Sequence, residues 1–290
     1  MGFFARIKNF FFPERRKLVL GLSLGSGGAK GMAHLGALKA FEEEGIFFSV
    51  ITGASIGAIV GALYAKGYTS EDMIAIVEGI NRREFAKNLR PFSDLSFVES
   101  FLERYLEGDI SSLPKPFAAW VTDGKTNTGL SLKSGKLARA LIASAAIPPF
   151  FRGVDIGGRK YYDGAFTNAV PADACKELGA EFVIGIDLAA YLPTEQEKSR
   201  VSRILGSAIS AVMPVKYTED SRSRGYAAAN IMLRPNLRGY GATDISRRAM
   251  DDMYELGYRE AKAHLKEIKD AIKEAERSAR KRKNKERSRA

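Results

Sequence analysis

The chain has 290 residues, of which 45% are hydrophobic and 27% are charged, so it has the composition of a globular protein with one large core or two small ones. Its single cysteine, Cys175, excludes an intramolecular disulfide and fits a reducing compartment. The net charge is +11, but residues 1–17 carry +4 and residues 276–290 carry +6, so the basic character lies at the two ends. Such ends usually meet an anionic surface, either phospholipid or nucleic acid, unless they are merely solvated.

The first 12 residues predict an amphipathic helix that lies in a lipid interface. Five large apolar side chains share one helical face: Phe3, Phe4, Ile7, Phe10 and Phe11. Pro13 ends this pattern, and the charges of Arg6 and Lys8 interrupt any apolar core of a secretory signal. The alternative is that these side chains dock onto the protein's own core or onto a second subunit. Residues 1–17 are therefore expected to be a basic membrane-association segment.

Strand-like and helix-like blocks alternate from Leu18 onward. The first expected elements are a strand at 18–24, a glycine loop at 25–31, a helix at 31–45, a strand at 47–52 and a helix from Ser55. Residues 45–65 carry no charge, and these 21 residues approach the ~20 needed to span a bilayer. Their β-branched and aromatic first part and the sharp turn at Ser55 instead favour strand, turn and helix. Gly57 and Gly61 are then sites of close helix packing.

The alternation continues through the rest of the chain. Short amphipathic helices are expected within 70–110, followed by strands at 117–123, 181–188 and 230–235 and helices at 134–147 and 171–180. A long helix begins near Ile245 and runs into the charged tail. This alternation predicts an α/β fold with a mostly parallel central sheet that is flanked by helices on both faces.

The strongest chemical signal is the segment Gly53-Ala54-Ser55-Ile56-Gly57, which follows an apolar strand and precedes a helix. Such an elbow holds the serine in a tight turn with its Oγ exposed, and the flanking glycines let the neighbouring backbone pass without Cβ clashes. Ser55 is therefore a candidate nucleophile. The same pattern also occurs by chance in turns rich in glycine and serine.

A glycine loop at residues 25–31 follows the first strand. Acyl transfer requires donors aimed at the oxyanion, and consecutive glycines allow backbone N–H groups to converge there, so Gly27 and Gly28 are candidate donors. A phosphate-binding loop is a poorer match, because Ala29 and Gly31 stand where a P-loop needs Gly before the lysine and Ser or Thr after it. The dinucleotide motif also fails, because Ser26 occupies the place of its first glycine.

A serine nucleophile needs a base, and the histidines of the chain are His34 and His264. We expect His34 to pack beside the glycine loop and His264 to be a solvated helix residue. A carboxylate is therefore the expected base. Asp163 and Asp123 each precede a glycine after a strand-like block, so spacing alone does not choose between them. Desolvation in a closed cleft would raise the aspartate pKa from its ordinary ~3.9 and make it a better base.

Three motifs in this order resemble the patatin-like phospholipases: the glycine loop ending in Lys-Gly, the elbow GASIG, and DGA at 163–165 followed by NAVP. The resemblance covers about residues 18–188. It implies a fold related to that of cytosolic phospholipases, a Ser-Asp dyad without histidine, no metal or other cofactor, and acyl hydrolysis of membrane lipids. By this resemblance Ser55 is the nucleophile and Asp163 is the base. The remaining roles it implies are oxyanion donors at Gly27 and Gly28 and supporting residues at Lys30, Gly53, Gly57 and Gly164.

This sequence departs from the family at Ser26, where the loop often begins with a further glycine. Lys30 is expected either to hold the loop or to meet lipid phosphate, and the alternative is a solvated lysine. We expect a catalytic domain at 18–188, a C-terminal part at 189–270 packed on it, and a basic tail at 271–290 that is helical or disordered.

The expected partners are a phospholipid or other lipid ester substrate and an anionic membrane surface, with the protein in the cytoplasm and peripherally attached to the membrane. Nucleic acid is not expected as a partner, and the sequence leaves the oligomeric state open. The rival functions are a soluble carboxylesterase or thioesterase on the same fold, and a membrane or nucleic-acid binding adaptor without catalysis.

Overall fold

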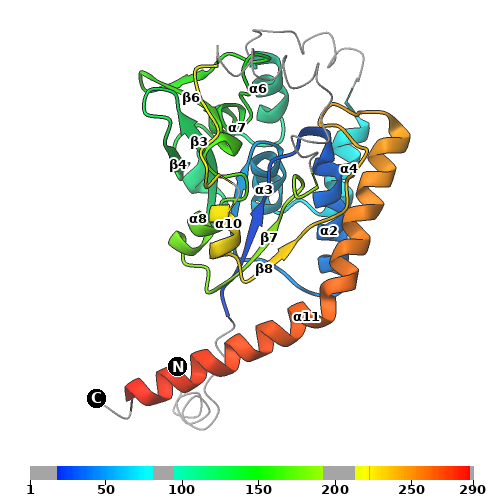
Figure 1. The fold of residues 1–290 in the computed structure, drawn as a ribbon, viewed down its shortest axis with the longest axis vertical. Coiled ribbons are helices and arrows are strands. Elements are labelled where there is room, and N and C mark those ends of the chain that lie inside the picture. Colours follow the sequence, from blue (N-terminus) through cyan, green and yellow to red (C-terminus); the bar gives the residue numbers. More distant parts are fainter. Residues whose placement is uncertain (1–17, 81–94, 192–212, 222, 288–290) are drawn as a thin grey trace, which may run out of the picture.

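The computed structural model describes residues 18–80, 95–191, 213–221 and 223–287 (Figure 1). The helix expected at residues 1–12 lies outside these described residues and stays a prediction. Among the described residues, no helix is both long enough and apolar enough to cross a membrane. The uncharged run at 45–65 instead forms a buried strand, a turn and a helix, as the sequence pattern favours.

One sheet forms the centre of the molecule, with the strand order β5-β6-β3-β2-β1-β7-β8 and with β4 paired to β3. The parallel strands are β1 (Leu20–Leu24), β2 (Val50–Ala54), β3 (Phe117–Asp123), β7 (Phe182–Ile186) and β8 (Ile231–Leu233). The antiparallel pairings are made by β4 (Gly129–Leu132), β5 (Val154–Ile156) and β6 (Arg159–Asp163). The predicted α/β fold with a mostly parallel sheet is confirmed. The C-terminal part expected at 189–270 contributes β8 to the same sheet.

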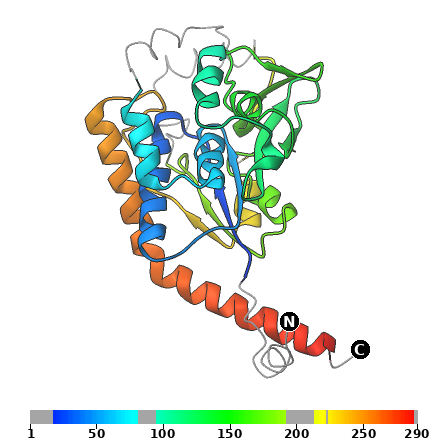
Figure 2. The same cartoon turned by 180° about the vertical axis from the view of Figure 1, so that it is seen from behind.

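Helices cover the sheet on both faces (Figures 1 and 2). They are α2 (Met32–Glu43), α3 (Ile56–Lys66), α4 (Ser70–Glu78), α6 (Ser96–Glu103), α7 (Leu137–Ser144), α8 (Ala172–Glu177), α10 (Ser223–Ala228) and α11 (Arg247–Arg287). Short 3-10 turns lie at η1 (Gly28–Gly31), η2 (Ile110–Ser112) and η3 (Gly164–Phe166).

Alternate residues of the central strands serve two different cores. Leu22 and Leu24 of β1 belong to the large core, whereas Val50 of β2 and Val183 of β7 pack with Cys175 of α8 in a smaller core. Burial on both faces is the usual state of parallel strands in an α/β protein. The carboxyl ends of the parallel strands therefore share one edge, where ligands of such folds bind.

α11 packs along α2 at a close helix crossing. A Cβ on Gly36 would come within 2.0 Å of the Tyr254 carbonyl oxygen, and a Cβ on Gly257 would come within 2.0 Å of that of Ala33, so both positions require glycine. Near the end of α2, Lys269 of α11 forms an ion pair of 2.6 Å with Glu44. Ala271, Ile272 and Ala275 still pack against the large core, and the red C-terminal end of α11 runs away from the other labelled elements in both views (Figures 1 and 2). The segment from 271 to 287 is thus helical.

Candidate active site

Ser55 lies between β2 and α3 in a backbone conformation that serine rarely adopts, with φ 56° and ψ −127°. The two glycines of the predicted elbow make this turn possible. A Cβ on Gly53 would come within 2.2 Å of the Gly57 carbonyl oxygen, and one on Gly57 would come within 2.2 Å of that of Leu24. Ser55 is 4% exposed and therefore occupies a sheltered site at the carboxyl edge of the sheet. The tight turn is the one that the GxSxG pattern predicts, whereas the predicted exposure of the serine side chain is not found among the described residues.

The backbone of Ser55 is held by a residue that the sequence reasoning missed. Ser55 N–H donates a hydrogen bond of 2.9 Å to the Oγ of Ser144, and this hydroxyl donates a bond of 2.7 Å to the carbonyl oxygen of Trp120. Ser144 is the last residue of α7 and is fully buried. The signal in the sequence is weak, because it is one small polar residue in the apolar run LIASAAI.

Asp163 ends β6 and is 0% exposed. Its Oδ1 accepts a hydrogen bond of 2.8 Å from the N–H of Ala165, while no donor in the described chain meets hydrogen-bond geometry at Oδ2. Burial raises the pKa of Asp163 to about 6, and this rise is opposed by the nearby Ser55 hydroxyl and by the Ala165 N–H. The structure thus brings Ser55 and Asp163 together. A Cβ on Gly164 would come within 2.3 Å of the Trp120 carbonyl oxygen, so glycine is required next to Asp163.

Asp123, the other Asp-Gly candidate, has a different environment. Its Oδ1 accepts hydrogen bonds from the N–H groups of Lys125 at 2.7 Å and Thr126 at 3.0 Å. These bonds lower the pKa of Asp123, with a further small contribution from the charge of Arg159. An acidic carboxylate that is occupied in capping its own turn is a poor base. The tertiary structure therefore distinguishes Asp163 from Asp123, which spacing could not do.

The glycine loop presents two amides that are free in the described chain. The N–H groups on either side are occupied, because Ser26 donates to the Ala169 carbonyl at 3.0 Å and Ala29 donates to that of Ala242 at 2.7 Å. Among the described residues, the N–H groups of Gly27 and Gly28 have no acceptor. Gly28 has φ +57°, and a Cβ there would come within 2.4 Å of the Ala242 carbonyl oxygen. The loop follows β1, the neighbour of the strand β2 that leads into Ser55, and free amides in such a loop are suited to stabilising an oxyanion.

His34 and His264 lie where the sequence places them, and neither contacts the hydroxyl of Ser55. His34 is fully buried behind the glycine loop, with its Nε2 2.8 Å from the carbonyl oxygen of Gly25. Burial lowers the pKa of His34 to about 4, so the ring is neutral near pH 7 and its Nε2–H donates to this carbonyl. His264 bonds through Nδ1 to the carbonyl oxygen of Glu260 within α11.

The alternative of a solvated Lys30 is wrong. Lys30 lies in η1 and is only 5% exposed. Burial lowers the pKa of Lys30, and the charge of Asp187 at the end of β7 opposes this shift. Asp187 is itself held by the Ala189 N–H at 2.7 Å and by the Tyr226 hydroxyl at 2.8 Å. The lysine therefore belongs to the buried support of the glycine loop.

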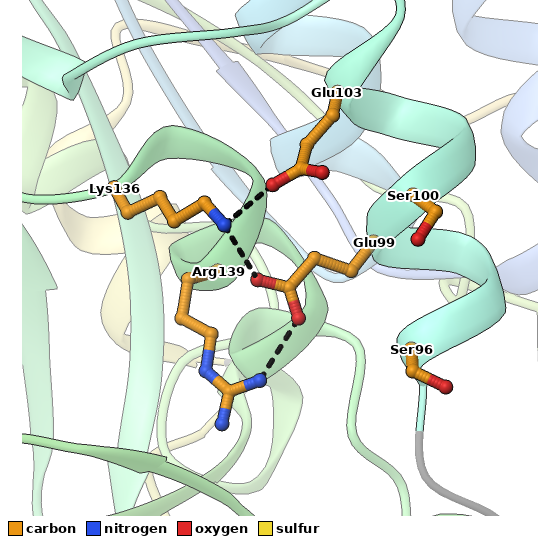
Figure 3. A pocket seen from close by; sticks show the side chains of 6 residues that line it. All are labelled: Ser96, Glu99, Ser100, Glu103, Lys136 and Arg139. Carbon is orange, nitrogen blue, oxygen red and sulfur yellow. Dashed lines mark hydrogen bonds and ion pairs between the residues drawn. The ribbon is translucent and has the colours of Figure 1, made fainter.

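A surface hollow of about 530 Å³ lies away from the dyad, between α6 and α7 (Figure 3). Its charged side chains are paired with each other, because Lys136 contacts Glu103 at 2.5 Å and Arg139 contacts Glu99 at 2.8 Å. These ion pairs tie the start of α7 to α6. Across the described ranges of the chain, no three His, Cys, Asp or Glu residues are grouped so that they could hold a metal ion.

The sequence of this chain is similar to that of known proteins. The family model for patatin-like phospholipase matches residues 22–176. "Patatin-like phospholipase domain-containing protein 6" of Mus musculus is 29% identical over 286 residues, which cover 84% of this chain and 20% of that protein. An uncharacterized NTE family protein of Mycobacterium tuberculosis is 30% identical over 174 residues, which cover 58% of this chain and 48% of that protein. The chain thus spans about a fifth of the length of the mouse relative.

Solved structures show the same fold at low sequence identity. VipD from Legionella pneumophila superposes with a TM-score of 0.53 at 15% identity, covering 85% of this chain and 66% of that one. Human GIVD cytosolic phospholipase A2 gives a TM-score of 0.53 at 11% identity, covering 90% of this chain and 60% of that one. Since the family model matches more than half of the residues, the chain belongs to the patatin-like phospholipase family.

Proposed function

We propose that this protein hydrolyses carboxylic esters of membrane phospholipids through an acyl-enzyme on Ser55, with Asp163 as the base. The observation that carries the proposal is the pair itself: a serine in a strained elbow beside a fully buried aspartate whose pKa is raised to about 6. A carboxylate with such a pKa is mostly ionised at neutral pH and accepts a proton better than an ordinary aspartate.

The reaction follows from the positions of these groups. Asp163 takes the proton of the Ser55 hydroxyl while Oγ attacks the ester carbonyl, and the N–H groups of Gly27 and Gly28 stabilise the negative oxygen that forms. The tetrahedral intermediate expels the alcohol, which receives the proton from Asp163. Water then attacks the acyl-enzyme while the same carboxylate takes its proton, and when the second tetrahedral intermediate breaks down, Asp163 returns this proton to Ser55 Oγ and the fatty acid leaves.

Family membership supports a lipid ester as substrate, and the phospholipid is our proposal within that class. The test is to incubate the protein with mixed phospholipid vesicles and to identify released fatty acids by mass spectrometry. A fluorophosphonate probe should label wild-type protein at Ser55 and leave Ser55→Ala unlabelled. Labelling without fatty acid release from vesicles, but with turnover of a short-chain ester, would indicate a soluble esterase. Absence of both would indicate an adaptor without catalysis.

We further propose that the protein binds an anionic membrane surface from the cytoplasmic side through its basic ends. Arg277, Arg280, Lys281 and Arg282 are exposed residues near the C-terminal end of α11, the end that projects from the rest of the described chain (Figures 1 and 2). This end of the molecule is opposite the carboxyl edge of the sheet that carries Ser55, because α2 starts beside the glycine loop and ends near the projection. The projection would therefore tether the protein, and residues 1–12 are the proposed second contact.

A further inference from the structure

The hydroxyl of Ser144 satisfies two buried backbone groups at once. It carries a single hydrogen, which goes to the Trp120 carbonyl oxygen at 2.7 Å, and its lone pair accepts the Ser55 N–H at 2.9 Å. The N–H of Ser55 belongs to a residue with φ 56°, a conformation that persists only where the surroundings hold it. Ser144 is thus the hydrogen-bond partner that fixes this strained turn.

The same end of α7 also holds the base. The N–H of Asp163 donates a hydrogen bond of 3.0 Å to the carbonyl oxygen of Ala146, two residues after Ser144. Residues 144–146 therefore bind the backbone of the nucleophile with one group and the backbone of the carboxylate with another. At its other end, α7 is tied to α6 by the ion pairs of Lys136 and Arg139 (Figure 3).

We propose that Ser144 is a positioning residue, which sets the place of the Ser55 hydroxyl relative to the Asp163 carboxylate. The inference rests on the proposed function, since it assigns the geometry of that dyad. Removing the hydroxyl takes one hydrogen-bond partner from the Ser55 N–H and one from the Trp120 carbonyl, which is costly for buried groups. The elbow then relaxes toward a less strained backbone, and Oγ moves away from the carboxylate.

The first test is the rate at which a fluorophosphonate labels Ser144→Ala. In this reaction Ser55 Oγ forms a bond to phosphorus, fluoride leaves, and the serine proton goes to Asp163. We expect the second-order labelling rate to fall by about 10- to 100-fold relative to wild type, as for loss of one well-placed buried hydrogen bond. With a chromogenic ester, kcat should fall while KM changes little, because Ser144 does not touch the substrate.

The second readout is the pH dependence of labelling. The Ser55 hydroxyl lowers the pKa of Asp163, so moving it away should shift the acidic limb of the rate profile to higher pH. The charged groups on the elements packed against Asp163 are Asp123 on β3, Arg159 and Lys160 on β6, and Lys136 and Arg139 at α7. None of them contributes to the Asp163 shift, which arises from burial. A merely structural role of Ser144 would leave this limb in place.

Matched variants separate positioning from loss of stability. Ser70→Ala removes another fully buried serine hydroxyl, which bonds to Glu42 at the start of α4, and the length of α3 separates it from Ser55. It should lower the melting temperature without changing the labelling rate. Ser144→Thr and Ser144→Val have side chains of the same shape, and only the first carries a hydroxyl. If the hydrogen bonds of this hydroxyl position Ser55, the Ser144→Thr protein should be labelled at least tenfold faster than the Ser144→Val protein.

The outcomes distinguish this inference from the proposed function. A folded Ser144→Ala protein with wild-type labelling rate and pH profile would overturn the positioning role while leaving Ser55 as the nucleophile. If Ser144→Ala did not fold, equal labelling rates for Ser144→Thr and Ser144→Val would overturn the positioning role instead. A wild-type protein that reacts elsewhere than at Ser55 would reject the proposed function, and the positioning role with it.

Discussion

His34 donates a hydrogen bond from Nε2 to the carbonyl oxygen of Gly25, at 2.8 Å, from a fully buried position behind the glycine loop. This places the histidine in a supporting position and away from proton transfer. We expect His34→Gln to keep ester hydrolysis within a few-fold of wild type, since an amide N–H can replace the ring N–H. His264→Gln on α11 should be indistinguishable from wild type. Loss of all activity in folded His34→Gln would instead give the histidine a chemical role.

The pH dependence of kcat/KM on a soluble ester should report the ionisation of Asp163. The base must be ionised to accept the serine proton, and burial raises its pKa to about 6. We therefore expect kcat/KM to rise about tenfold per pH unit below about 6 and to level off above it. A profile flat from pH 4 to pH 8 would argue against a buried carboxylate base.

Asp163→Asn should abolish hydrolysis and yet stabilise the protein at alkaline pH. Because the folded-state pKa lies above the unfolded one, this group favours the folded state fully at low pH, and the advantage is lost as pH rises through about 6. An amide cannot ionise, so the variant avoids this loss. For a rise in pKa from 3.8 to about 6, this loss of stability is about 2 kcal/mol between pH 4 and pH 8.

Urea unfolding of wild type and Asp163→Asn at both pH values measures this difference. Asp123→Asn is the matched control, and its effect on stability at high pH should be opposite to that of Asp163→Asn. Hydrogen bonds from its own turn lower the pKa of Asp123, so the ionised carboxylate stabilises the fold above its unfolded pKa. This variant should be less stable than wild type at pH 8 but should retain activity. An inactive Asp123→Asn beside an active Asp163→Asn would show that the wrong carboxylate was chosen.

Hydrolysis of a soluble ester should survive a chelator. Neither member of the proposed dyad needs a cation, since the carboxylate takes the proton and the loop amides meet the oxyanion. We expect the rate in excess EDTA to stay within about twofold of the rate without it. Strict dependence on added calcium would count against this mechanism.

Vesicle binding should depend on the basic ends, whereas hydrolysis of a soluble ester should not. Each Lys or Arg near an anionic surface contributes about 1 kcal/mol, less at high salt, and each buried large apolar side chain of residues 1–12 about 1.5–3 kcal/mol at most. Deleting residues 1–12 should weaken sedimentation with anionic vesicles at any salt concentration. Reversing the charges of Arg277, Arg280 and Arg282 should weaken it only at low salt.

The control for the charge reversal is Lys125→Glu with Lys160→Glu, which alters the basic side of a surface hollow next to β6. Equal vesicle binding by the 1–12 deletion and the full chain would leave the α11 projection as the contact. Loss of vesicle binding only in the variant with Lys125→Glu and Lys160→Glu would instead indicate that the membrane contacts the side of the antiparallel strands.

Much of this protein could be predicted from local sequence. The alternation of apolar blocks gives the α/β fold, because parallel strands buried on both faces leave a recognisable pattern. The elbow around Ser55 could also be predicted, since the pattern of strand, GxSxG and helix is local, and Gly53 is required by contact with the nearby Gly57 carbonyl. The requirement for Gly57 comes from the Leu24 carbonyl of β1, which only the fold brings close. The contacts that exclude a side chain at Gly27 and Gly28, by contrast, come from Leu188 and Ala242, which lie far along the chain.

Only the tertiary structure shows that the two Asp-Gly pairs have different surroundings. Both motifs look alike in sequence, but Asp163 is buried beside Ser55 while Asp123 is occupied by the amides of its own turn. It also revealed Ser144, which lies 89 positions from the Ser55 N–H that it accepts. A hydrogen bond between residues so far apart leaves no periodic trace, because its energy depends on where two elements meet. The sequence therefore determines which nucleophile and which carboxylates are available, and packing determines which of these groups lie next to each other.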